Sequence, residues 1–90
     1  MKQKTFTVTV YSDAGHAWAK VKRQVLLNLG IANKVSRYSY QYKDNVYLEE
    51  DCDAGTFFQA YEQKFGKKPA YRDSYLERTP IRYYSAFTVL

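Results

Sequence analysis

A single cysteine, Cys52, is present in this chain of 90 residues, so no internal disulfide can hold the fold together. The fold must then rest on packing, and a chain of this length is the usual size for one hydrophobic core. Aromatic residues make up 18% of the chain and include ten tyrosines, whose rings bury large areas per side chain. We therefore expect one globular domain over residues 1–90.

The N-terminal part of the chain predicts a strand followed by a turn. Phe6, Val8 and Val10 alternate with threonines and a tyrosine, which is the period of a strand. Residues 12–15 then contain serine, aspartate and glycine, which favour tight turns. A second element is expected directly after this turn.

That second element fits two patterns, because residues 16–29 carry both a helical stripe and strand alternation. We expect a short strand over 16–22 followed by a helix over 23–29. Gly30 is expected to end the helix in the left-handed conformation, with Ile31 supplying an apolar contact.

The middle of the chain predicts a β-hairpin. Strands over 37–42 and 46–50 flank a polar stretch, and we place a two-residue turn at Asp44-Asn45 because both residues tolerate positive φ. This turn sets Tyr42 opposite Tyr47. It also gathers tyrosines on one sheet face beside Glu49, namely Tyr38, Tyr40, Tyr42 and Tyr47. Such a face either packs under helices or forms an exposed stacking or protein-binding platform, and the sequence leaves both open.

A second helix is expected after the hairpin. Asp53 is placed as its N-cap, and Gly66 as its end. Its aromatic residues recur at helical spacing and are Phe57, Phe58, Tyr61 and Phe65. One or two strands are expected over 70–90, with Pro80 at a strand start or edge.

These elements predict the α+β fold class. The simplest arrangement is a small antiparallel sheet of about four to five strands with two helices packed on one face.

Tyrosine and arginine are enriched in protein interfaces, and both recur on the hairpin and in the last quarter of the chain. The arginines there are expected to form an exposed positive surface. The candidate partner-binding residues are Arg72, Arg78, Arg82, Tyr83, Tyr84, Tyr40, Tyr42 and Tyr47. An acidic run over 49–53 is either functional or only a helix N-terminus that the helix dipole favours.

Residues that could carry chemistry are sparse. His16 is the sole histidine, and with Cys52 it falls short of the three or four ligands of a zinc site. Acidic neighbours are expected to raise the pKa of Cys52 and oppose its use as a nucleophile. The glycines form no phosphate-binding pattern. We therefore expect no enzyme, no metal site and no cofactor.

The net charge of +5 weakly favours an acidic or nucleic-acid partner, although no RNA- or DNA-binding motif is present. No segment reaches the roughly 20 apolar residues of a membrane span. The N-terminus alternates instead of forming the apolar core of a signal peptide. We expect a cytoplasmic protein with no membrane partner.

Several segments resemble a family of small bacteriophage, prophage and plasmid proteins that has no established activity. They are Tyr11-Ser12-Asp13-Ala14-Gly15-His16-Ala17-Trp18, Leu29-Gly30-Ile31, Tyr38-Ser39-Tyr40 and Tyr47-Leu48-Glu49-Glu50-Asp51-Cys52-Asp53. The resemblance implies a context in which small proteins bind and block host machines, including CRISPR effectors. The chain departs from the family at Lys22, which leaves open how the first helix starts. It also departs in its tail over 86–90, which leaves open whether the C-terminus pairs in the sheet or in a homodimer.

The leading hypothesis is a non-catalytic binding protein of a phage or mobile element. It would inhibit a host defence machine in the host cytoplasm by binding a protein or a ribonucleoprotein complex. The alternative is a small basic DNA- or RNA-binding module. The least favoured hypothesis is an enzyme that uses His16 with Asp13 or Cys52.

Overall fold

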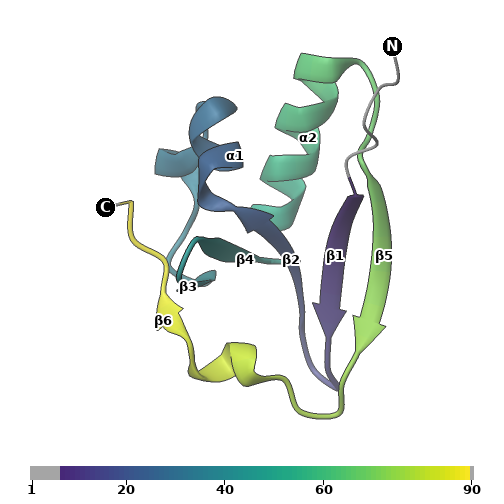
Figure 1. Cartoon of the computed structure of the whole chain (residues 1–90), viewed down its shortest axis with the longest axis vertical. Coiled ribbons are helices and arrows are strands. Elements are labelled where there is room, and N and C mark those ends of the chain that lie inside the picture. The colour runs from purple at the N-terminus through teal and green to yellow at the C-terminus, as the bar shows by residue number, and fades with distance from the viewer. Residues whose placement is uncertain (1–6, 90) are drawn as a thin grey trace.

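A six-stranded sheet runs through the molecule in the order β5-β1-β2-β4-β3-β6. The computed structural model describes residues 7–89. The strands are β1 Thr7–Ser12, β2 Ala17–Lys22, β3 Tyr40–Tyr42, β4 Asn45–Glu49, β5 Ala70–Tyr75 and β6 Ser85–Ala86. The helices are α1 Arg23–Asn28 and α2 Asp53–Phe65, with single 3₁₀ turns η1 Ala32–Lys34 and η2 Pro80–Tyr83 (Figure 1).

The α+β class is confirmed, but the sheet is mixed and larger than predicted. The β1–β2, β2–β4, β3–β4 and β3–β6 pairs are antiparallel, whereas β5 runs parallel to β1. The cause is α2, which carries the chain back across the sheet after β4. The next strand therefore starts at the same end as β4 and points the same way.

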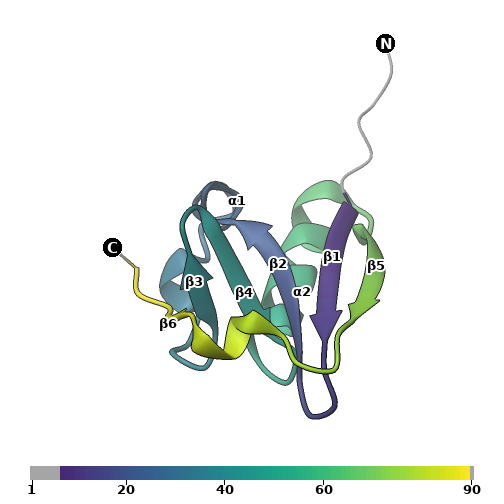
Figure 2. The ribbon, with the colours of Figure 1, turned by 60° about the horizontal axis from the view of Figure 1, so that its bottom comes forward.

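One sheet face packs against both helices, as the sequence predicts. Helices α1 and α2 lie on this side of the sheet (Figure 2). Leu26 of α1 and Phe57 of α2 are fully buried against it. The strand residues beneath them are Val8, Ala19, Val21, Val46 and Leu48. Successive side chains of a strand alternate between faces, so the residues between these point to the opposite face.

The opposite face carries the hairpin tyrosines, and we call it the tyrosine face. Trp18 and Tyr47 are buried there against Ile81 of η2, and Tyr11, Tyr40 and Tyr84 pack around them. The segment over residues 76–84, called the C-terminal segment below, crosses this face (Figure 2). The tyrosines thus form a second small core under this segment, not under the helices.

Helix α1 begins and ends where the sequence places it. The N–H of Gly30 donates to the carbonyl of Leu27, and that of Ile31 donates to the carbonyl of Leu26, both at 3.0 Å. Gly30 has a φ of 72°, and Ile31 is buried. These two hydrogen bonds form the Schellman motif. The motif needs a residue with positive φ, which glycine adopts without the steric strain that a Cβ atom would cause.

The predicted turn of the hairpin is wrong by one residue. Tyr42 lies opposite Asn45, and Tyr40 lies opposite Tyr47, so Lys43 and Asp44 form the loop. The pairing of β4 with β2 sets this register, and the Asp44 carbonyl accepts a hydrogen bond of 2.8 Å from the Arg23 N–H. A turn moved by one residue shifts the pairing between the two strands by two residues. An even shift keeps each side chain on its predicted face, so Tyr40, Tyr42 and Tyr47 still share a face.

Residues 37–39 form a turn and not the predicted strand, because a buried carboxylate holds this loop. Asp53 accepts hydrogen bonds from the Ser36 N–H at 3.0 Å, the Ser36 hydroxyl at 2.6 Å and the Ser39 hydroxyl at 2.5 Å. Asp53 is the first residue of α2, and Cys52 is the N-cap, so the predicted cap is also wrong. The same network turns Tyr38 out of the sheet and leaves it 75% exposed.

The C-terminal part returns to the sheet. Pro80 begins η2 and not a strand. Ser85–Ala86 pairs with β3 inside the same chain, and Phe87 is buried on the helix side, with its N–H donating to the Ser39 carbonyl at 2.9 Å. A homodimer stays a prediction. Phe6 of the predicted first strand lies outside the described residues.

Replacing Asp53 with alanine is expected to lower the free energy of unfolding by about 3 kcal/mol, because buried donors of Ser36 and Ser39 lose a charged acceptor. Urea unfolding measures the change. Asp51→Ala is the control, since Asp51 is exposed and the change should stay within about 0.5 kcal/mol. Equal losses in the two variants would contradict this role of Asp53.

Candidate functional site

The turn between β1 and β2 is built around Asp13, as the sequence predicts. Its Oδ1 accepts hydrogen bonds from the N–H groups of Gly15 and His16, both at 3.0 Å. This side-chain-to-backbone turn fixes His16 at the start of β2. The His16 ring stacks on Trp18, with 5.8 Å between the ring centroids.

Arg82 of η2 reaches the same carboxylate from the C-terminal segment. Its Nε and Nη2 donate to Oδ2 and Oδ1 of Asp13 at 2.6 and 2.8 Å. Nη2 also lies 2.9 Å from Nδ1 of His16, and the guanidinium carbon lies 5.7 Å from the centre of the Trp18 ring. A guanidinium only donates, so Nδ1 of His16 is the acceptor in this contact.

This ion pair shapes the local electrostatics. The hydrogen bonds from Arg82, reinforced by the backbone of Gly15 and His16, hold the pKa of Asp13 well below its ordinary range. A Cβ atom on Gly15 would lie 3.3 Å from Nη2 of Arg82, so the close approach favours glycine. Arg82 is therefore part of the fold and not a free surface arginine.

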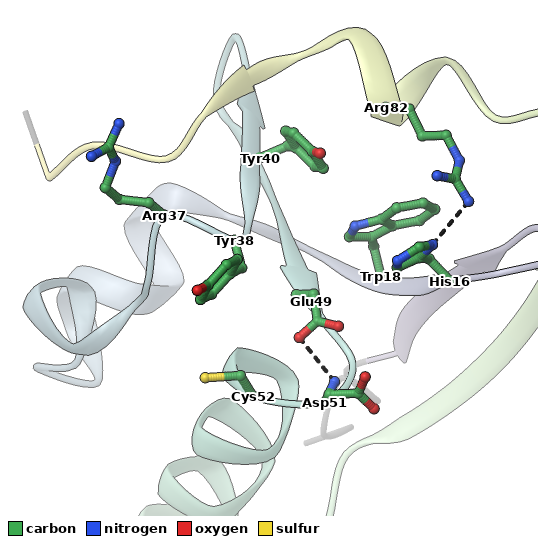
Figure 3. A pocket seen from close by; sticks show the side chains of 9 residues that line it. All are labelled: His16, Trp18, Arg37, Tyr38, Tyr40, Glu49, Asp51, Cys52 and Arg82. Atoms are coloured by element: carbon green, nitrogen blue, oxygen red, sulfur yellow. Dashed lines mark hydrogen bonds between the residues drawn. The ribbon is translucent and has the colours of Figure 1, made fainter.

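His16, Trp18 and Arg82 form one side of an open pocket on the tyrosine face (Figure 3). The pocket has a volume of about 420 Å³. Its other lining residues are Arg37, Tyr38, Tyr40, Glu49, Asp51 and Cys52. Residues from three separate parts of the chain, 16–18, 37–40 and 49–52, thus meet Arg82 at this pocket.

Two carboxylates in the pocket lack a basic partner among residues 7–89. Glu49 accepts a hydrogen bond of 3.0 Å from the N–H of Asp51, and neither side chain forms an ion pair with a described residue. Arg37 points away from both carboxylates (Figure 3), and the charge of Arg82 is balanced by Asp13. The pocket therefore offers negative charge to a ligand.

Aromatic rings stand beside these carboxylates. The Trp18 and Tyr40 rings meet edge to face at 6.3 Å, and Tyr38 projects from the 36–39 turn. Aromatic faces and carboxylates together attract a guanidinium or an ammonium group. The arrangement is suited to holding a cation on a ligand.

Nucleophilic or metal chemistry finds no support at the pocket. The Asp53 carboxylate, which accepts a hydrogen bond from the thiol, raises the pKa of Cys52, and Glu49 adds to this. No hydrogen bond joins His16 to Cys52 in the described part of the chain. Across residues 7–89, no cluster of His, Cys, Asp and Glu could hold a metal ion.

The predicted tyrosines are brought together in part. Tyr42 stacks on Tyr84 with 4.6 Å between centroids, and Tyr84 lies 5.1 Å from Tyr47. Burial and the neighbouring Tyr84 and Tyr11 raise the pKa of Tyr47 to about 12, so its hydroxyl stays protonated. Tyr47 is a core residue, Tyr40 lines the pocket, and Tyr42 stays half exposed.

The predicted arginines are brought together in part. Arg78, Arg82 and Tyr83 line one pocket next to Asp13, to which Arg82 is tied. Tyr83 is 89% exposed there. Arg72 lies on the edge strand β5 and does not line this pocket.

Sequence reasoning missed Trp18, Glu49 and Asp51 as site residues. Trp18 is both a buried core residue and a lining residue of the pocket, and the sequence leaves the acidic run over 49–53 open between a functional role and a helix N-terminus. The pairing of β2 with β4 places Trp18 opposite Glu49, and that pairing joins segments far apart in the sequence. Tyr47 and Glu49 are two residues apart in a strand, and this spacing was the one local signal that their side chains share a face.

Comparison with protein-family models, curated proteins and solved structures gives no match for this chain. The fold and the pocket define a small α+β protein whose mixed sheet has helices on one face and an aromatic, acidic pocket on the other. Within residues 7–89, no helix is both long enough and apolar enough to span a membrane.

Arg82→Ala is expected to lower the free energy of unfolding at neutral pH. It should also reduce the further decrease of that free energy between neutral and acidic pH. The pKa of Asp13 is lowered in the folded protein, so the pair stabilises above the unfolded pKa near 4 and is lost as pH falls below it. Urea unfolding midpoints at about pH 7 and pH 3 test this. Arg78→Ala, in the same segment, should keep the wild-type profile, and an unchanged profile in Arg82→Ala would rule out the pair.

The Cys52 thiol is expected to react slowly despite its exposure. Its raised pKa leaves less thiolate near neutral pH, and the thiolate is the nucleophile. Alkylation by iodoacetamide should be slower than that of glutathione, and faster in Glu49→Gln. A faster rate than glutathione would show an activated cysteine.

Proposed function

We propose that this chain is a non-catalytic binding protein that holds a basic side chain of a protein partner in the pocket of Figure 3. The observation that carries the proposal is a pair of carboxylates, Glu49 and Asp51, that line the pocket together with aromatic rings. Neither carboxylate forms an ion pair with a described residue. A partner's arginine would complete this arrangement.

Arginine suits the pocket better than lysine. Its planar guanidinium stacks on aromatic faces such as Tyr38 and donates in a fork that matches a carboxylate. Contact with an aromatic ring contributes about 0.5–2 kcal/mol, and charge-assisted hydrogen bonds add to this. Glu49 is half-buried, which reduces solvent screening of its charge, so its pair with an arginine should be stronger than an ion pair on the open surface.

A protein is favoured over a nucleic acid at this pocket, because Glu49 and Asp51 would repel phosphates. The resemblance to phage and plasmid proteins supports a host machine as the target. Machines that bind nucleic acid present arginine and lysine on their surfaces, so a defence ribonucleoprotein such as a CRISPR effector supplies the required chemistry. Binding there would block the machine without catalysis, and in the host cytoplasm.

Trp18 gives a direct test, because it is the sole tryptophan and lines the pocket. Titration with arginine-containing peptides is expected to change the fluorescence of Trp18 until the signal saturates. The same peptides with citrulline, which is neutral and similar in shape, should bind at least about tenfold more weakly. Equal responses to both peptides would remove the cation-binding role.

Glu49→Gln with Asp51→Asn is expected to lose the arginine-peptide response and to release a partner captured from host cells. Glu62→Gln with Asp73→Asn is the control, since it removes the same charge from exposed positions elsewhere. Retention of the partner by both double variants would place the protein interface outside this pocket.

A further inference from the structure

One end of the tyrosine face is not covered by the C-terminal segment. Strand register sets Thr9 between Lys20 and Arg72 in a single cross-strand row. The next row contains Lys22, Asn45 and Tyr42 in neighbouring strands. We call these two rows the basic rows.

The basic rows contain no acid of their own, although Asp44 lies beside Lys22 at the hairpin loop. Lys20, Lys22 and Arg72 are their charged members, and Glu49 stands at the other end of the face, opposite Trp18. Arg72 and Lys20 lie two strands apart, which separates their backbones by about 10 Å. Long side chains at that spacing reach successive phosphates of an extended strand.

An aromatic ring adjoins this charge. Tyr42 is 47% exposed and stacks nearly parallel on Tyr84, with an interplanar angle of 12°. The Lys43 ammonium lies 5.4 Å from the centre of the Tyr42 ring. A base could extend this stack by displacing the flexible lysine, while Lys43 moves to a phosphate.

A groove between the rows supplies polar groups. It measures about 230 Å³ and is lined by Thr7, Thr9, Lys20, Val21, Lys22 and Asn45. The Oδ1 atom of Asn45 is buried and accepts no hydrogen bond from residues 7–89. Buried acceptors are nearly always paired, so rotation of the Asn45 amide toward the groove would let this oxygen accept a hydrogen bond from a base amino group.

We infer that the basic rows bind single-stranded nucleic acid, with Lys20, Lys22 and Arg72 on phosphates and a base stacked on Tyr42. Single strands are favoured because an exposed ring stacks only on an unpaired base. This site lies apart from Glu49 and Asp51, so it does not depend on the pocket's role. If the pocket binds a protein and the basic rows bind a nucleic acid, a nucleoprotein is the partner that fits both sites.

The test is fluorescence anisotropy with labelled single-stranded DNA and RNA over a range of salt. Binding is expected to weaken with salt, because phosphate contacts release counterions. Lys20→Gln with Lys22→Gln should lower the slope of log affinity against log salt by about 1.4, at roughly 0.7 for each contact. Lys34→Gln with Lys64→Gln removes the same charge on the helix side and should leave the slope unchanged.

Tyr42 separates stacking from simple charge attraction. Tyr42→Ala should weaken binding at least about fivefold, while Tyr42→Phe keeps the ring and should bind as the wild type does. Absence of oligonucleotide binding, equal affinity for duplex and single strand, or equal weakening by both lysine double variants would overturn the inference. A protein partner that protects Lys20 and Lys22 without any oligonucleotide binding would also overturn it.

Discussion

The carboxylate of Asp13 joins the two ends of this fold. It closes the first turn through the backbone of residues 15 and 16 and binds Arg82 through two hydrogen bonds. The C-terminal segment is thereby held across the tyrosine face, where Ile81 buries Trp18 and Tyr47. This contact works with the pairing of β6 with β3 to hold the cover of the aromatic side, and it fixes the side of the pocket formed by Arg82 and His16.

The second buried carboxylate, Asp53, positions the other side of the pocket. It ties residues 36 and 39 to the start of α2, which sets the backbone on either side of Tyr38. Each acid accepts several hydrogen bonds, because a buried carboxylate is tolerated only when it is well satisfied. Glu49 and Asp51 thus leave negative charge open at one end of the tyrosine face, and Lys20, Lys22 and Arg72 leave positive charge open at the other.

Local sequence signals were reliable where one element decided its own structure. The turn at Asp13 follows from side-chain capping, and the end of α1 at Gly30 follows from the tolerance of glycine for positive φ. They failed where a distant partner competed. The pairing of β4 with β2 moved the hairpin turn, and Asp53 drew residues 36–39 out of the predicted strand.

The sequence by itself determined the α+β class, both helices, and the gathering of Tyr40, Tyr42 and Tyr47 on one face, because periodicity fixes which side chains share a face. Only the tertiary structure decided what covers that face, that β5 runs parallel to β1, and which residues line the pocket. Those outcomes depend on contacts such as Arg82 with Asp13, which lie 69 residues apart and leave no pattern in either local segment.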